Sequence, residues 1–188
     1  MDCNRADLVE ELGSKYGSFA AASLSQFGSD AVPAIITATQ STNPAVRSSA
    51  ARIFNGGNRG YYGIIRDPRL TEAALAWLKD SEPSVRIAGV ETLTDYSNWN
   101  PVYTERLVAM LHDEDAGVRH AVASLLPSDV PRFRRDIEKY IPVFKEMLKD
   151  KDPGVRAAGL EILQRLQVEI PREDFPAASS SSVGSPAK

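Results

Sequence analysis

The stretch SEPSVRIAGVETL, residues 81–93, decides the fold, because its pattern occurs three more times along the chain. The other copies are TNPAVRSSAARIF at 42–54, EDAGVRHAVASLL at 114–126 and KDPGVRAAGLEIL at 151–163. Each copy contains a Val-Arg pair, and successive pairs are 39, 33 and 37 residues apart. Repetition with a period of this length is typical of proteins built from stacked helical units.

Each copy predicts the start of a helix. A proline occupies positions 44, 83 and 153, where the first turn of a helix tolerates a missing N–H. Small or apolar residues then recur at helical spacing, which indicates a buried stripe that a neighbouring helix approaches closely. The side chains that we expect to cap these helices are Asn43, Ser81, Asp115 and Asp152.

A second apolar segment of helical period precedes each Val-Arg pair. These segments are AVPAIITAT at 31–39, AALAWLKD at 73–80, RLVAMLHD at 106–113 and IPVFKEMLKD at 141–150. The repeating unit is therefore predicted to be helix, short turn, helix. One hairpin is too small to bury its own apolar face, so copies are expected to stack and share a core. We expect an all-α fold, a right-handed α-solenoid of about four to five stacked helical hairpins.

The repeats resemble the HEAT repeat family, whose pattern places an aspartate near the end of the first helix and an arginine early in the second. The resemblance covers roughly residues 30–166. It implies a structural ladder of polar contacts between adjacent repeats, formed here by Asp80, Arg86, Asp113, Arg119, Asp150 and Arg156. The first repeat has Thr39 and Ser41 where the others have Leu and Asp, so we expect the ladder to lack a rung there.

Three regions follow from these patterns. Residues 1–29 are predicted to be a degenerate N-terminal capping hairpin, since terminal repeats are atypical. Residues 30–168 form the predicted HEAT-like repeat domain. Residues 169–188 combine prolines with a serine run and lack periodicity, which predicts a disordered tail or linker.

Composition limits the classes of partner. The 188 residues include 22 basic and 25 acidic side chains, a net charge of -3, so no strong field favours nucleic acid. No apolar run is long enough to span a bilayer, and the N-terminus does not resemble a signal peptide. We expect a cytoplasmic, monomeric protein that binds no membrane.

No catalytic set emerges from the sequence, and we expect neither an enzyme nor a cofactor or metal. His112 and His120 fall short of the three or four converging ligands that a metal needs, and both are interpreted as surface residues. The glycine-rich segment at 55–63 lacks the strand, helix and Lys-Ser/Thr ending of a phosphate-binding loop. It is interpreted as a connection between repeats.

The links between hairpins, at 55–70, 94–102 and 127–136, hold the aromatic and arginine residues typical of binding surfaces. Loops at equivalent places in stacked repeats emerge along one edge, which we call the loop rim. Its predicted partner-binding residues are Arg59, Tyr61, Tyr62, Arg66, Tyr96, Trp99, Arg132, Phe133, Arg134 and Arg135. The alternative is that these aromatic rings fold back and cover the edge of the core.

A second candidate surface is the second-helix row, two and six residues after each valine. The resemblance implies that second helices line the concave face, where partners dock. The row comprises Ser48, Arg52, Ile87, Glu91, His120, Ser124 and Glu161, with no concentrated charge. Such a mixed surface suits a protein or peptide better than a phosphate backbone.

The leading hypothesis is a non-catalytic interaction scaffold or adaptor that binds a protein or peptide. The alternative is a nucleic-acid-binding protein similar to the DNA glycosylases built from HEAT-like repeats, supported by the arginine and aromatic residues of the links. A further alternative is similarity to the HEAT-like lyases that attach bilin pigments, which rests on the fold alone.

Overall fold

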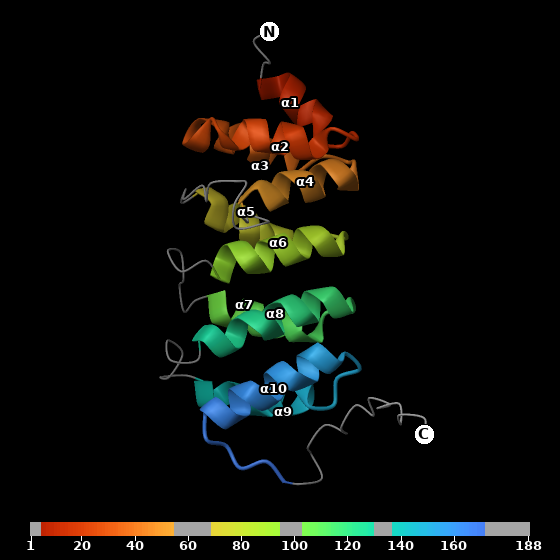
Figure 1. Cartoon of the computed structure of the whole chain (residues 1–188). Coiled ribbons are helices and arrows are strands. Elements are labelled where there is room, and N and C mark those ends of the chain that lie inside the picture. Colours follow the sequence, from red (N-terminus) through yellow and green to blue (C-terminus); the bar gives the residue numbers. More distant parts are fainter. Residues whose placement is uncertain (1–4, 55–68, 95–102, 130–136, 172–188) are drawn as a thin grey trace, which may run out of the picture. The chain divides into compact units, whose positions relative to one another are not determined.

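The computed structural model describes residues 5–54, 69–94, 103–129 and 137–171, and this part of the chain is all-helical (Figure 1). Its α-helices are α1 (Arg5–Glu11), α2 (Gly17–Ser25), α3 (Val32–Ala38), α4 (Pro44–Phe54), α5 (Arg69–Trp77), α6 (Pro83–Thr94), α7 (Thr104–Ala109), α8 (Ala116–Asp129), α9 (Ile141–Met147) and α10 (Pro153–Arg165). Short 3-10 turns precede or follow three of them, as η1 (Gly28–Ala31), η3 (Met110–His112) and η4 (Ile137–Tyr140). None of the helices in the described ranges is long and apolar enough to cross a membrane.

The chain separates into two compact units, residues 1–125 and 126–188. In the first unit, α1 packs against α2, α3 against α4, and α5 against α6, so successive helices pair. These pairs also lie side by side, because α3 contacts α1 and α5, while α4 contacts α2 and α6 (Figure 1). First helices therefore contact first helices and second helices contact second helices. In the second unit, α9 packs against α10.

The four Val-Arg copies do begin helices, as their pattern predicts. Helices α4, α6 and α10 start at the three predicted prolines, and α8 starts at Ala116. Asn43 caps α4 by accepting from the Ala45 N–H at 3.0 Å. Asp115 and Asp152 accept from the N–H groups of the valines three residues on, at 3.1 and 2.9 Å.

The predicted cap at Ser81 is wrong, because α6 begins one residue later than that prediction requires. Glu82 directly precedes the helix, and its backbone carbonyl accepts from the Val85 N–H at 3.1 Å. Ser81 instead faces the preceding hairpin, where its hydroxyl accepts from Arg47 at 3.3 Å. The turn residue is thereby used for a contact between hairpins rather than for capping.

Paired helices approach closely where the sequence has glycine near the middle of the second helix. A Cβ placed on Gly89 of α6 would lie 2.9 Å from the Ala74 carbonyl oxygen of α5 and 3.2 Å from the Trp77 Cβ. A Cβ on Gly159 of α10 would lie 2.7 Å from the Met147 Cβ of α9. Both glycines are buried, and they let the two helices of each hairpin pack backbone against side chain.

The predicted capping region contains two helices, α1 and α2, that pack together. Their connecting turn contacts the start of α4, because a Cβ on Gly13 would lie 2.7 Å from the Val46 Cγ2. Residues 172–188 of the predicted tail lie outside the described residues, and residues 168–171 adopt no helix.

Candidate functional site

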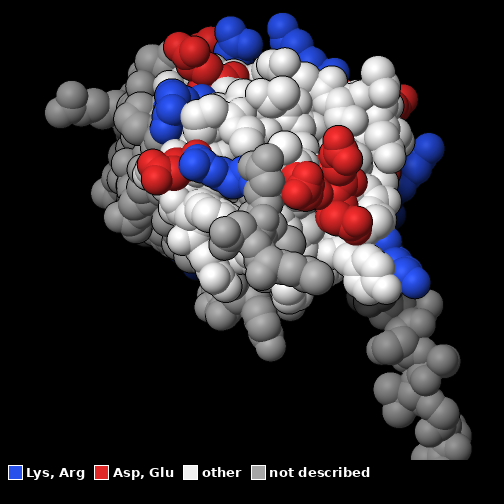
Figure 2. Space-filling view, turned by 90° about the horizontal axis from the view of Figure 1, so that it is seen from above, with Lys and Arg blue, Asp and Glu red and all other residues white. Residues whose placement is uncertain are grey.

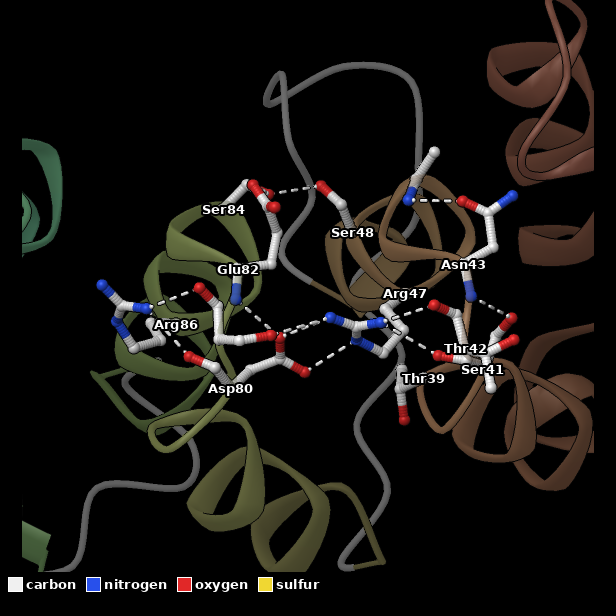
Figure 3. A network of polar contacts seen from close by, with 12 residues as sticks. Thr39, Ser41, Thr42, Asn43, Arg47, Ser48, Asp80, Glu82, Ser84 and Arg86 are labelled. Carbon is white, nitrogen blue, oxygen red and sulfur yellow. Dashed lines mark hydrogen bonds and ion pairs between the residues drawn. The ribbon is translucent and has the colours of Figure 1, made fainter.

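Arg47 and Asp80 join the hairpin α3–α4 to the hairpin α5–α6 (Figure 3). Arg47 donates from Nε to Asp80 Oδ2 and from Nη2 to Asp80 Oδ1, both at 2.9 Å. This is the parallel two-bond arrangement that suits a planar guanidinium and a carboxylate. Both side chains are largely buried, with 13% and 14% of their surface exposed.

Arg86 and Asp113 repeat the same arrangement one hairpin further along. Arg86 donates from Nε to Asp113 Oδ2 at 2.8 Å and from Nη2 to Asp113 Oδ1 at 2.7 Å. The pair is more deeply buried than the first, with 7% and 9% of the side-chain surface exposed. The same nitrogen atoms meet the same oxygen atoms in both contacts, so this is a recurring device.

The remaining nitrogen of each arginine binds the turn of its own hairpin. Arg86 Nη1 donates to the carbonyl oxygens of Asp80 and Ser81, at 2.8 and 3.2 Å. Arg47, Arg119 and Arg156 make the equivalent pair of contacts, at 2.8 to 3.3 Å. In all four repeats the turn of the same hairpin therefore holds the guanidinium, independently of any contact with a neighbouring hairpin.

The aspartates also shape the turns in which they lie. Asp80 Oδ1 accepts from the N–H of Glu82 at 2.8 Å, and Asp113 and Asp150 accept in the same way from the residues two positions on, at 2.9 and 2.8 Å. Ser41 uses its hydroxyl for this purpose, accepting from the Asn43 N–H at 3.2 Å. A serine therefore preserves the turn without a carboxylate.

The first rung is lost on both sides at once, which explains the serine. The position six residues after Ser14, where the later repeats have arginine, is Ala20 in α2. With alanine at this position, α2 presents no guanidinium for a carboxylate at Ser41. Losing both partners of a buried polar pair costs little, whereas losing one leaves the other unsatisfied. Ser41 still contributes its carbonyl oxygen to Arg47, at 3.0 Å.

The predicted ladder does not include Arg47, although Arg47 belongs to the same Val-Arg pattern as the other arginines. The Val46-Arg47 pair is the sequence signal for this residue, but position 41, six residues earlier, is serine rather than aspartate. The relevant aspartate lies 33 residues later, in the next hairpin. For Arg119 the structure describes the contacts to its own turn, and Asp150 belongs to the other compact unit.

The contacts alter the acid–base properties of the paired groups. The hydrogen bond to Asp113 raises the pKa of Arg86 above its usual value, against the opposing effect of burial. Burial by itself raises the pKa of Asp80. The hydrogen bonds from Arg47 and from the Glu82 N–H, together with the two neighbouring arginine charges, outweigh burial, so the net pKa of Asp80 is lowered. Both groups are thus held in their charged forms near neutral pH.

In the first unit, the residues of the second-helix row lie on α4, α6 and α8. They differ in whether their side chains contact a neighbouring helix or are exposed to solvent. Ser48 donates to the Ser84 hydroxyl at 2.7 Å, and Ile87 packs toward Gly117, so both connect neighbouring helices. Arg52, His120 and Ser124 are exposed. The row therefore combines contacts between helices with exposed polar residues on α4 and α8.

Glu91 lies in the same row and is half-buried. Burial raises the pKa of its carboxyl group, and the nearby charge of Arg52 partly opposes this effect. Glu161, the row member on α10, is exposed and accepts from Arg165 at 2.7 Å within its own helix. The spacing of the repeats predicts the place of Glu91 in the row, but its burial depends on how the helices pack.

The ten predicted residues of the loop rim, from Arg59 to Arg135, all lie outside the described residues. Of the same links, Arg69 is described as the exposed first residue of α5 and donates to the Ser29 carbonyl oxygen at 3.4 Å. The loop rim therefore remains a prediction from sequence.

His112 and His120 are exposed, at the end of η3 and in α8. Across residues 5–54, 69–94, 103–129 and 137–171, no group of three or more His, Cys, Asp or Glu side chains is arranged to hold a metal ion. In comparisons with known proteins, no family model and no curated protein matches this sequence.

Proposed function

We propose that this chain is a HEAT-type helical-repeat scaffold that binds a protein or peptide segment and performs no catalysis. The single observation that carries the proposal is the contact between hairpins, made by the same atoms in Arg47–Asp80 and in Arg86–Asp113. A polar pair repeated in register holds neighbours together, whereas a catalytic centre requires a unique constellation. We extend this to a right-handed α-solenoid of about four to five hairpins.

The second-helix row is the docking surface that the described residues support best. Its exposed members carry hydrogen-bonding groups on two of the second helices, Arg52 on α4 and His120 and Ser124 on α8. The ladder lies at the turns, so these three exposed residues are separate from the arginine–aspartate contacts between hairpins. A short segment of polypeptide, whose backbone offers donors and acceptors along its length, matches exposed polar groups of this kind.

A capture experiment with three matched baits tests this assignment. The baits are the intact chain, a row variant with Arg52→Glu, His120→Glu and Ser124→Glu, and a control with Lys79→Glu and Arg106→Glu on exposed positions of the first-helix side. We expect the same proteins to be retained by the intact and control baits and lost from the row variant. Equal retention by all three would reject the row, and the loop rim would then be tested by replacing Tyr61, Tyr62, Trp99 and Arg134 with alanine.

The absence of any protein retained by the intact bait would contradict the scaffold proposal itself. Titration with labelled duplex DNA at low salt separates the nucleic-acid alternative, because phosphate contacts are strongest there. Saturable binding of the duplex would favour that alternative over a protein partner.

A further inference from the structure

Glu91 lies on the side of α6 that meets both neighbouring second helices. Ile87, one turn earlier in α6, approaches α8, since a Cβ placed on Gly117 would lie 3.6 Å from the Ile87 Cδ1. Ser84, one turn before Ile87, accepts from the Ser48 hydroxyl of α4 at 2.7 Å (Figure 3). Residues three and four apart lie on the same side of a helix, so Glu91 continues this line. Its carboxylate therefore belongs to the surface that α4, α6 and α8 form together.

Burial distinguishes Glu91 from most other glutamates of the chain. Of the glutamates that the structure describes, all except Glu82 and Glu91 are exposed. Viewed from the side of α1 and α2, for example, acidic side chains lie in groups at the surface, where water hydrates them (Figure 2). Glu82 is half-buried, but its carboxylate accepts from the Ser84 hydroxyl at 3.1 Å. Glu91 is half-buried without a bond of this kind from the described residues.

The surroundings of the Glu91 carboxylate compensate only part of the cost of its burial. Arg52 of α4 attracts the carboxylate through its charge, and burial outweighs this attraction, so the pKa of Glu91 is raised. Arg52 is itself exposed, and water screens its charge. Removing a carboxylate from water without a hydrogen bond costs free energy, and proteins retain such costs mainly at functional sites.

We propose that the segment bound by the second-helix row carries a lysine or arginine whose side chain binds the Glu91 carboxylate. This inference rests on the proposed function and specifies the chemistry of the partner. A cationic donor matches the site better than a neutral one, because hydrogen bonds between charged groups are about twice as strong as those between neutral groups. Arg52, being exposed, then binds a carbonyl or carboxylate oxygen of the same segment. The row variant that replaces Arg52 is therefore still expected to lose the partner.

Peptides selected from a random display library with the intact chain provide the probe. We expect the selected peptides to share a lysine or arginine. Binding of one selected peptide, measured by fluorescence anisotropy, should weaken about tenfold when that basic residue is changed to glutamine. Glu91→Gln in the chain should weaken the unmodified peptide by a similar factor. Glu72→Gln, the same change at an exposed position of α5, is the matched control and should have no effect.

Stability distinguishes a binding role of Glu91 from a structural one. Glu91→Gln removes a half-buried charge, so this variant should be at least as stable as the unmodified chain at pH 7 although it binds the peptide less tightly. Loss of binding together with loss of stability would assign Glu91 a structural role and overturn the inference.

Combining the two glutamine changes tests whether the two side chains meet. If the basic residue binds Glu91, then Glu91→Gln should weaken a peptide that already lacks this residue by much less than it weakens the unmodified peptide. The pKa of Glu91, followed by NMR, should be raised in the free chain and should fall when the peptide binds, because a nearby positive charge favours the ionised carboxylate.

The outcomes separate this inference from the proposed function. Selected peptides without a basic residue, additive effects of the two glutamine changes, or a pKa of Glu91 that is already lowered in the free chain would each overturn the inference and leave the scaffold proposal standing. Selection of no peptide by the intact chain would contradict the scaffold proposal, and the inference would fail with it.

Discussion

Arg86 and Asp113 face each other through two parallel hydrogen bonds of 2.8 and 2.7 Å, while the third nitrogen of Arg86 binds the turn before its own helix. One side chain therefore orders a turn within its hairpin and joins that hairpin to the next. Because both charged side chains are largely buried, leaving either one without its partner is expected to destabilise the fold.

Removing one member of this pair is expected to be costly. Arg86→Met should lower the free energy of unfolding by about 3–5 kcal/mol, since it leaves the Asp113 carboxylate buried and unpaired. Urea denaturation followed by circular dichroism measures the change. Arg47→Met, at the more exposed rung, should cost less, and Lys79→Met, at an exposed position, should change stability by about 0.5 kcal/mol or less. A loss for Arg86→Met no larger than that for Lys79→Met would contradict the role of the pair.

Acid should weaken the Arg47–Asp80 rung. The pKa of Asp80 is lower in the folded state than in the unfolded chain, so its stabilising contribution is complete above the unfolded value of about 3.9. That contribution is lost as pH falls through the lowered pKa of the folded state. The free energy of unfolding is measured for the unmodified chain and for Asp80→Asn between pH 7 and pH 2.

The stability difference between these two proteins should shrink as the pH falls, because a protonated aspartate resembles asparagine. Asp80→Asn retains the side-chain oxygen that accepts from the Glu82 N–H, so the turn itself is preserved. A difference that stays constant over the whole range would show that Asp80 contributes nothing through its charge.

Glu91 should have the opposite pH dependence. Burial raises the pKa of its carboxyl group, so the folded state holds this proton more tightly than the unfolded chain does. The contribution favours folding below the unfolded value of about 4.3 and is lost as pH rises through the folded pKa. Glu91→Gln should therefore stabilise the chain at pH 7, by up to about 1 kcal/mol in the free energy of unfolding and with a higher melting temperature, but give no gain at pH 4.

Differential scanning calorimetry at both pH values measures this effect. Glu10→Gln, on the exposed side of α1, is the control and should change stability by less than about 0.5 kcal/mol. If Glu91→Gln destabilises the chain at pH 7, then attraction to Arg52 outweighs the cost of burial.

Gly89→Ala should destabilise the first unit, although alanine favours a helix by up to about 1 kcal/mol over glycine. The new Cβ would lie 2.9 Å from the Ala74 carbonyl oxygen, a backbone atom that moves only with α5. We expect a net loss of about 1–3 kcal/mol in urea denaturation. Gly117→Ala is the control, because its nearest neighbours are the side-chain atoms of Asp115 and Ile87, which adjust more easily. Equal effects of the two substitutions would argue against close packing of α5 on α6.

The positions of the helices were predictable from sequence because local rules determine them. Proline at the first turn, a capping residue before it and apolar residues at helical spacing all act within a few residues of one another. They located the starts of α4, α6, α8 and α10 and the first helices that precede them. The wrong prediction of a cap at Ser81 also has a local cause. Two polar residues, Ser81 and Glu82, precede Pro83, and the structure shows that Glu82 is the residue directly before the helix.

The partners of the arginines were decided by tertiary structure. The sequence predicts contacts between adjacent repeats but does not say which aspartate each arginine binds. Arg86 bonds only to the carbonyl oxygen of the aspartate six residues earlier and binds the carboxylate of the next hairpin. Arg47 follows the same rule despite Ser41. The burial of Glu91 likewise depends on helices distant in sequence. The amino-acid sequence by itself determined where helices form, because those forces act along the chain. Packing decided which charges meet and lose water, because those forces act between segments far apart in sequence.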